Sequence, residues 1–140
     1  MCSSDLVELQ RALGVDIVDV LGSTELLVVL ESEQAVRDCT PDMAALARLP
    51  WPGVIVTAMG TQHDFVSRYF APAIGIPEDP VTGSTHCSLI PYWSKRLGKQ
   101  GLTAYQCSAR GGELFCRLEG GRVKIGGHAT LVASGKLLLG

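Results

Sequence analysis

The sequence has no long apolar run, and it shows no excess of charge of either sign. Its longest aliphatic stretch runs from Leu26 to Leu30, whereas a membrane-spanning helix needs roughly 20 apolar residues. The first residues have neither the basic start nor the apolar segment of a secretory signal. These absences argue against a membrane protein and predict a cytoplasmic one.

Cysteine, histidine and basic residues are present without the grouping that metal or nucleic-acid sites require. The five cysteines form no Cys-x-x-Cys pair, and the three histidines are far apart in the sequence. We therefore expect free thiols and no metal site. The 12 Lys and Arg residues are scattered and nearly balance the 14 Asp and Glu residues, so no basic stripe marks a nucleic-acid partner.

The composition that is present is typical of a single globular domain spanning residues 1–140. The chain is 46% hydrophobic and 19% charged, with a formal net charge of −2. Such a sequence buries enough apolar surface to fold, and its apolar fraction is too high for a disordered chain.

Hydrophobic periodicity and turn residues predict an α+β fold with a mostly antiparallel sheet. Helices are expected at residues 5–14 and 40–49, with Thr40 as a cap, and at 84–97, where Pro91 must kink or divide the helix. Apolar segments separated by Gly or Ser predict strands, with a tight turn at Gly22-Ser23. The expected strands are residues 15–21, 24–30, 53–59, 64–71, 102–108, 113–118, 122–125 and 128–139.

The most informative segment is residues 70–86, which includes Glu78-Asp-Pro-Val-Thr-Gly-Ser84-Thr-His86. It predicts a strand end, a Gly/Pro loop and the start of the helix at 84–97. The first amides of a helix lack backbone partners and carry part of its positive dipole, so such a loop can hold a carboxylate or phosphate. On local pattern alone, Thr82 or Ser84 as a simple helix cap and Asp79 as a turn residue remain an alternative.

Other sites fit the sequence poorly. The loop has no Walker spacing and no Gly-x-Gly-x-x-Gly run, and Ser84 lacks the Gly-x-Ser-x-Gly turn of serine hydrolases. Arg68 on its strand could reach an anionic ligand, but a solvated or salt-bridged arginine is the commoner arrangement.

Six segments together resemble the phenazine-biosynthesis PhzF-like family, whose members share the fold of diaminopimelate epimerase. The similarity runs from about residue 53 to the end, and residues 1–52 agree only in the order of their elements. The segments are Asp64–Pro72, Glu78–His86, Pro91–Trp93, Leu97–Lys99, Gln106–Gly112 and Val123–Gly127.

The resemblance implies one lobe of a two-lobe protein, in which each lobe wraps a sheet around a central helix. It implies isomerisation by proton transfer on a small carboxylate or amino acid-like substrate, without a cofactor. In this family pattern Asp79 faces the substrate as the catalytic carboxyl. Gly83 and Ser84, with Thr85 beside them, hold the substrate carboxylate at the start of the helix.

The chain departs from the family in covering only the second lobe. The family's principal acid/base glutamate belongs to the first lobe, and neither Glu78 nor the Gly127-His128-Ala129 run replaces it. We therefore expect an isomerase-type lobe that works as a homodimer or with a first-lobe partner. The alternatives are a non-catalytic domain that binds small carboxylates or dimerises, and a fragment of a longer enzyme.

Overall fold

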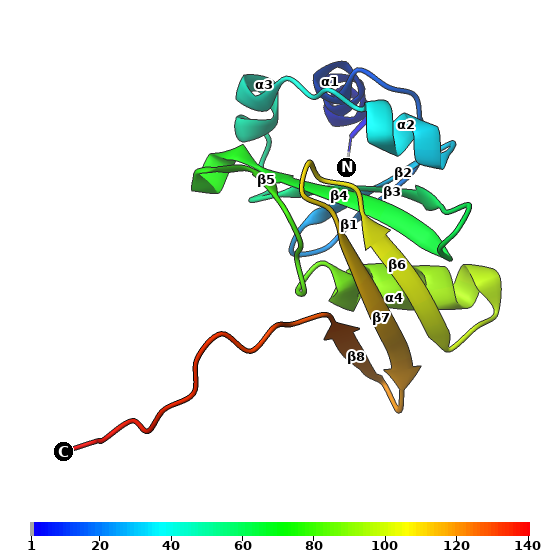
Figure 1. Ribbon diagram of the computed structural model, residues 1–140. Coiled ribbons are helices and arrows are strands. Elements are labelled where there is room, and N and C mark those ends of the chain that lie inside the picture. The colour runs from blue at the N-terminus through cyan, green and yellow to red at the C-terminus, as the bar shows by residue number, and fades with distance from the viewer. Residues whose placement is uncertain (1) are drawn as a thin grey trace.

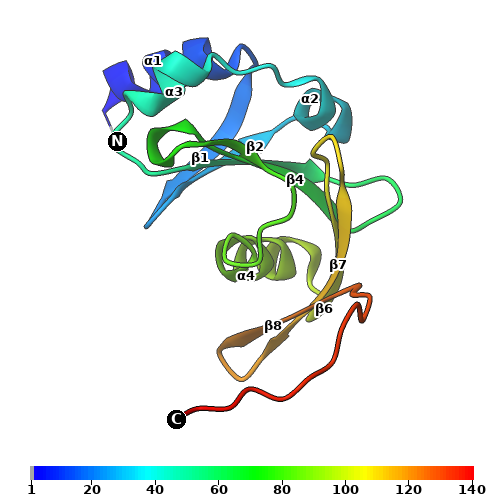
Figure 2. The ribbon, with the colours of Figure 1, turned by 60° about the vertical axis from the view of Figure 1, so that its left-hand side comes forward.

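One curved sheet organises the chain (Figures 1 and 2). The structure is a computed structural model that describes residues 2–140. Within this range eight strands form the sheet in the order β1-β2-β3-β4-β6-β7-β8, and β5 pairs with β4. The strands are β1 (Ile17–Gly22), β2 (Leu26–Leu30), β3 (Val54–Met59), β4 (Phe65–Ala71), β5 (Ile76–Asp79), β6 (Gly101–Gln106), β7 (Gly112–Glu119) and β8 (Arg122–Gly127).

Most neighbouring strands run antiparallel, which confirms the predicted fold class. The parallel pairs are β2 with β3 and β4 with β6. The first is connected through two short helices and the second through β5 and a long helix, since parallel strands need a crossover. The helices are α1 (Ser3–Leu13), α2 (Glu33–Asp38), α3 (Met43–Ala47), the 3₁₀ turn η1 (Pro72–Ile74) and α4 (His86–Leu97).

Helices cover both faces of the sheet. Helix α4 lies on the concave side, and α1, α2 and α3 lie on the other (Figure 2). The aliphatic strand β2 is buried on both sides because its residues alternate between two cores. Leu26, Val28 and Leu30 pack with the α1–α3 side, whereas Leu27 and Val29 pack with α4.

Most predicted elements are confirmed within a few residues. Helix α1 ends at Gly14, which has the left-handed φ of 67° that favours glycine. Strands β1 and β2 form the expected hairpin, with Leu21 opposite Leu27. Strands β3, β4, β6, β7 and β8 also occupy the predicted segments.

Three details of the predicted helices need correction. Helix α3 is shorter than expected, and its cap is Asp42 rather than Thr40, since the Asp42 side chain accepts from the amide of Ala45. Helix α4 begins at His86, after a turn at residues 83–85. Pro91 does not divide α4, because buried residues on both sides of it, among them Ile90 and Trp93, anchor the helix to the sheet.

Other differences lie outside the predicted helices. The strand expected at residues 128–139 is wrong: residues 128–140, called the tail below, are exposed and have no regular secondary structure. Two further elements have no counterpart among the predicted ones: the short helix α2, and strand β5, which forms within the expected loop. Of the helices in residues 2–140, none is long and apolar enough to cross a membrane.

Candidate functional site

Strand β5 delivers Asp79 to one end of helix α4. Asp79 is the last residue of β5 and lies opposite Tyr69 of β4. Its side chain is half-buried, and its Oδ2 accepts a hydrogen bond from Thr82 Oγ1 at 2.5 Å. Residues 79–85, called the site loop below, connect this carboxylate to the helix.

Three backbone amides remain free at the α4 end of the site loop. The first backbone hydrogen bonds of this turn are donated by the amides of His86 and Cys87 to the carbonyls of Gly83 and Ser84. Among residues 2–140, the amides of Gly83, Ser84 and Thr85 have no acceptor. Gly83 and Ser84 are exposed, and a Cβ placed on Gly83 would meet nothing within 4 Å. The helix dipole adds positive potential there, so the turn can accept a carboxylate.

The side chain of Thr85 serves the loop rather than an outside ligand. Thr85 is 1% exposed, and its hydroxyl donates to the carbonyl of Thr82 at 3.0 Å. A contact between Thr85 and a substrate is thus left to its backbone amide. The predicted roles of Asp79, Gly83, Ser84 and Thr85 remain predictions, but the fold brings all four residues into one short segment.

His86 supports the same loop from below. Its ring is fully buried, and Nδ1 donates to the carbonyl of Thr82, since a carbonyl oxygen only accepts; that distance is 2.7 Å. Its Nε2 has no partner among the described residues. Burial lowers the pKa of His86, because the low-dielectric core disfavours the imidazolium.

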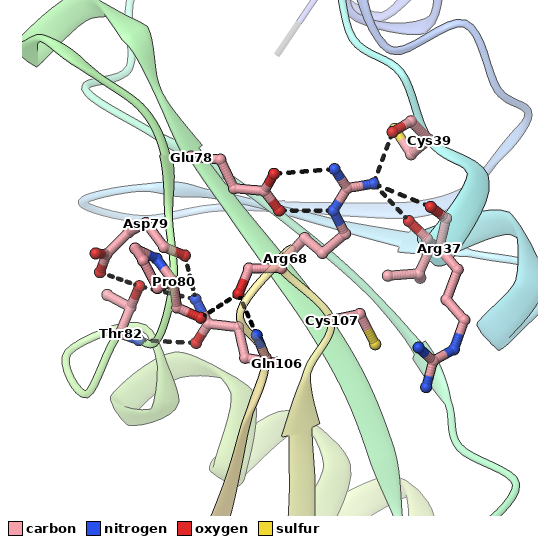
Figure 3. A network of polar contacts seen from close by, with 12 residues as sticks. Arg37, Cys39, Arg68, Glu78, Asp79, Pro80, Thr82, Gln106 and Cys107 are labelled. Carbon is pink, nitrogen blue, oxygen red and sulfur yellow. Dashed lines mark hydrogen bonds and ion pairs between the residues drawn. The ribbon is translucent and has the colours of Figure 1, made fainter.

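The end of strand β6 holds the site loop from the side (Figure 3). Gln106 is buried and bonds to the Asp79 carbonyl and to both the amide and hydroxyl of Thr82. Ser108 donates to the carbonyl of Pro80 at 2.7 Å and accepts from the amide of Gly111. The sequence analysis placed Gln106 and Ser108 in a family segment without assigning them a role. Only the fold shows that they contact the loop.

A bidentate ion pair links β5 to β4, and the same arginine reaches the helix layer at α2. Arg68 on β4 donates from Nε and Nη2 to the two carboxylate oxygens of Glu78, at 2.7 and 3.0 Å. Its Nη1 also reaches the carbonyls of Val36 and Cys39 at the end of α2. Glu78 raises the pKa of Arg68. Arg68 is therefore salt-bridged, the commoner of the two arrangements considered. Glu78 and Asp79, as successive strand residues, point in opposite directions.

The site loop faces an open surface. A hollow of about 590 Å³ lies beside Gly83 and is lined in part by Val81, Arg110, Glu113 and His128. Asp79 does not line it. In the described part of the chain, no three His, Cys, Asp or Glu side chains come together as metal ligands would. Asp79 and the free amides thus lie at an open surface of the lobe, and their role as a site remains a prediction.

Comparisons with known proteins point to one family. The model of the PhzC-PhzF family, described as phenazine biosynthesis-like protein, matches residues 5–135. A Pseudomonas aeruginosa protein described as an uncharacterized isomerase is 74% identical over 134 residues, which cover 95% of this chain and 51% of that protein. A PhzF-family crystal structure from Enterococcus faecalis has a TM-score of 0.87 at 50% identity and covers 94% of this chain and 51% of its own.

A second crystal structure, of a putative phenazine biosynthesis PhzC/PhzF protein from Clostridium difficile, has a TM-score of 0.86 at 43% identity. The match covers 99% of this chain and 52% of the Clostridium difficile chain. The chain therefore spans about half the length of the relatives it matches, and the family match reaches residue 135, within the tail.

Proposed function

Because the chain belongs to the PhzC-PhzF family of phenazine biosynthesis-like proteins, we propose that it is an isomerase-type lobe. It acts by cofactor-free proton transfer on a small carboxylate or amino acid-like substrate. The observation that carries this proposal is the position of the Asp79 carboxylate. Its Oδ2 accepts a hydrogen bond from Thr82 at 2.5 Å, and Thr82 directly precedes Gly83, whose amide is the first of the three free ones. A proton-transferring group and an anion-binding turn thereby belong to one rigid segment.

The two parts of the segment divide the chemistry between them. The substrate carboxylate binds at the amides of Gly83, Ser84 and Thr85, where the helix dipole favours negative charge. The bound carboxylate orients the neighbouring carbon toward Asp79, which takes or returns a proton there. Such positioned general acid–base catalysis contributes typically 10²- to 10⁴-fold.

Efficient turnover requires a second wall, because proton transfer at carbon needs a donor and an acceptor around a substrate shielded from water. We propose that a second copy of the chain supplies this wall, or else a separate first lobe. The tail supports the need for a partner: five large apolar side chains in it are 83–92% exposed. They are Leu131, Val132, Leu137, Leu138 and Leu139.

Two copies would bring two Asp79 carboxyls to one cleft. This pair differs from the arrangement expected for the family, with its glutamate from the first lobe. Two like carboxyls in one site can share a proton, one acting as acid while the other acts as base. A homodimer would therefore retain proton exchange, with lower efficiency than a two-lobe enzyme.

Solvent-deuterium exchange tests the proposal. The purified chain is incubated in heavy water with single small amino and hydroxy carboxylates, and loss of the proton next to the carboxylate is followed by NMR. We expect exchange on at least one compound, and a loss of about 100-fold or more in Asp79→Asn. Asp16→Asn, at an exposed carboxylate outside the site loop, is the matched control and should keep the wild-type rate.

The alternative function gives a different result in the same samples. A non-catalytic carboxylate-binding domain would show binding heat in calorimetry without any deuterium exchange. Exchange that is equal in wild type and Asp79→Asn would contradict the assigned role of Asp79.

A further inference from the structure

One buried side chain, Gln106, holds the site loop through three hydrogen bonds. Gln106 is 0% exposed. Its Nε2 donates to the Asp79 carbonyl and to Thr82 Oγ1, both at 3.0 Å, and its Oε1 accepts from the Thr82 amide at 2.8 Å. Both hydrogens and the oxygen of the side-chain amide are thus used within residues 79–82.

These contacts determine which way the amide points. A reversed amide would set its oxygen against the carbonyl oxygen of Asp79 and its NH₂ group against the N–H of Thr82. Both contacts would then be repulsive, inside a buried site where an unpaired polar group is costly. Gln106 therefore presents its two hydrogens to Asp79 and Thr82.

The orientation of Gln106 in turn directs the Thr82 hydroxyl. Because Nε2 of Gln106 can only donate, Thr82 Oγ1 accepts from it and has one hydrogen left. That hydrogen points to Oδ2 of Asp79, 2.5 Å away. Among the described residues, Oδ1 of Asp79 has no hydrogen-bond partner. The two carboxyl oxygens are therefore unequal: one is an occupied acceptor, and the other is open.

We propose that Gln106 is a positioning residue which acts through Thr82 to fix the Asp79 carboxyl and to reserve its Oδ1 for proton transfer. This inference rests on the proposed function. When Asp79 takes a proton, the substrate C–H bond breaks, the proton goes to Oδ1, and the electron pair stays on the substrate. The reverse step returns the proton from Oδ1 to carbon. Thr82 keeps its own proton throughout.

Side-chain NMR of the full chain tests the positioning without any substrate. Three-bond couplings report the Asp79 χ1 angle, and hydrogen exchange reports the Thr82 amide. In wild type we expect the couplings of a single staggered rotamer. Gln106→Glu replaces a donor by an oxygen that competes for the Thr82 hydroxyl. In that variant the Asp79 couplings should become averaged, and exchange of the Thr82 amide should rise about tenfold.

A pair of variants at position 82 separates positioning from simple packing. Thr82→Val keeps the shape but removes the hydroxyl, and should free Asp79 as Gln106→Glu does. Thr82→Ser keeps the hydroxyl and should retain the single rotamer. Gln100→Glu, at an exposed glutamine, is the matched control for the change at Gln106. If Gln106→Glu does not fold, the Val and Ser variants decide the question.

Two results would overturn the proposal. One is an Asp79 side chain that already averages between rotamers in wild type. The other is a single, unchanged rotamer in folded Thr82→Val. Neither depends on deuterium exchange, so a failure of the proposed function remains distinguishable: the Asp79 rotamer would then respond to these variants while no substrate proton exchanged.

Discussion

The site loop and the tail of this chain are opposites in how they are held. Within seven residues, the site loop forms hydrogen bonds to buried Gln106 and His86 and to half-buried Ser108. The tail forms no strand, and its large apolar side chains are at least 83% exposed. Figure 1 shows it extending from the end of β8 away from the sheet and α4.

This difference separates the part of the lobe that is positioned by its own contacts from the part that is left uncovered. The Asp79 carboxylate and the turn proposed to bind the substrate anion are positioned by contacts within the lobe. The tail shows the reverse, because its large apolar side chains remain exposed, which is the reason for proposing that another protein surface covers them. The half-length match to the relatives agrees with both observations.

The largest expected effect is a core truncation compared with the same truncation in the tail. Leu89 is 0% exposed and packs between α4 and the sheet, so Leu89→Ala should lower the free energy of unfolding by about 3 kcal/mol. Leu138 is 89% exposed, and Leu138→Ala should change it by less than about 0.5 kcal/mol. Urea unfolding at low protein concentration measures both. Similar losses in the two variants would mean that the tail is packed.

The ion pair behind the loop comes next. Arg68→Met leaves Glu78 without its partner, with a side chain that is 22% exposed, and should cost about 2 kcal/mol. Lys124→Met removes the open pair with Glu119, whose side chains are 68% and 54% exposed, and should cost less than about 0.5 kcal/mol. Equal effects in urea unfolding would show that Arg68 does not anchor β5.

The pH dependence of stability should expose the histidine beneath the loop. Burial lowers the pKa of His86 below its ordinary 6.5, so the unfolded chain binds a proton more readily than the folded one. Stability is then complete above about pH 6.5 and falls as the pH drops below it, by at most about 1.4 kcal/mol per pH unit. The carboxylates with lowered pKa, such as Glu33, add their own loss of stability only below about pH 4.5.

Unfolding free energies between pH 5 and 7.5 check this expectation. His86→Gln should flatten the slope in that range. A wild-type slope that persists in His86→Gln would assign it to another group.

The smallest expected effect is that of removing the tail. A chain ending at residue 127 should unfold within about 0.5 kcal/mol of the full chain at low concentration, because the tail is exposed and the contacts of its His128, with Glu113 at 3.3 Å and with Phe115, lie at the surface. Its site loop should give the same NMR signals. A changed loop would show that the two regions are coupled.

Local signals predicted the fold where side-chain pattern and backbone agree. Gly14 marks the end of α1 correctly, and the aliphatic run of β2 indicates a strand buried on both sides. The tight turn predicted at Gly22-Ser23 is displaced, since Gly22 still belongs to β1 opposite Leu26 and the loop comprises residues 23–25. Strand β5 was hidden because Pro77 and Gly75 are typical of loops, and it forms only by pairing with β4. The tail has the composition of a strand, but a strand forms only where it pairs with a neighbour, and the tail pairs with none of the described strands.

The site was predictable in part for the same reason. Asp79, Gly83 and Ser84 lie within a few residues, so their proximity follows from the sequence. Gln106 is 24 residues from Thr82, and only the parallel pairing of β6 with β4 brings it to the loop. Arg68 likewise contacts Glu78 because the chain turns back between β4 and β5. A sequence pattern does not specify that turn.

The solution mass of the chain tests most directly the proposal that a second copy, rather than a separate first lobe, completes this half of a site. Light scattering on a sizing column, over a dilution series, compares the full chain with one ending at residue 127. For the full chain at high concentration, we predict about twice the 14.9 kDa chain mass. For the shortened chain, we predict the mass of one chain at every concentration. A full chain that remains at 14.9 kDa at every concentration would contradict the claim.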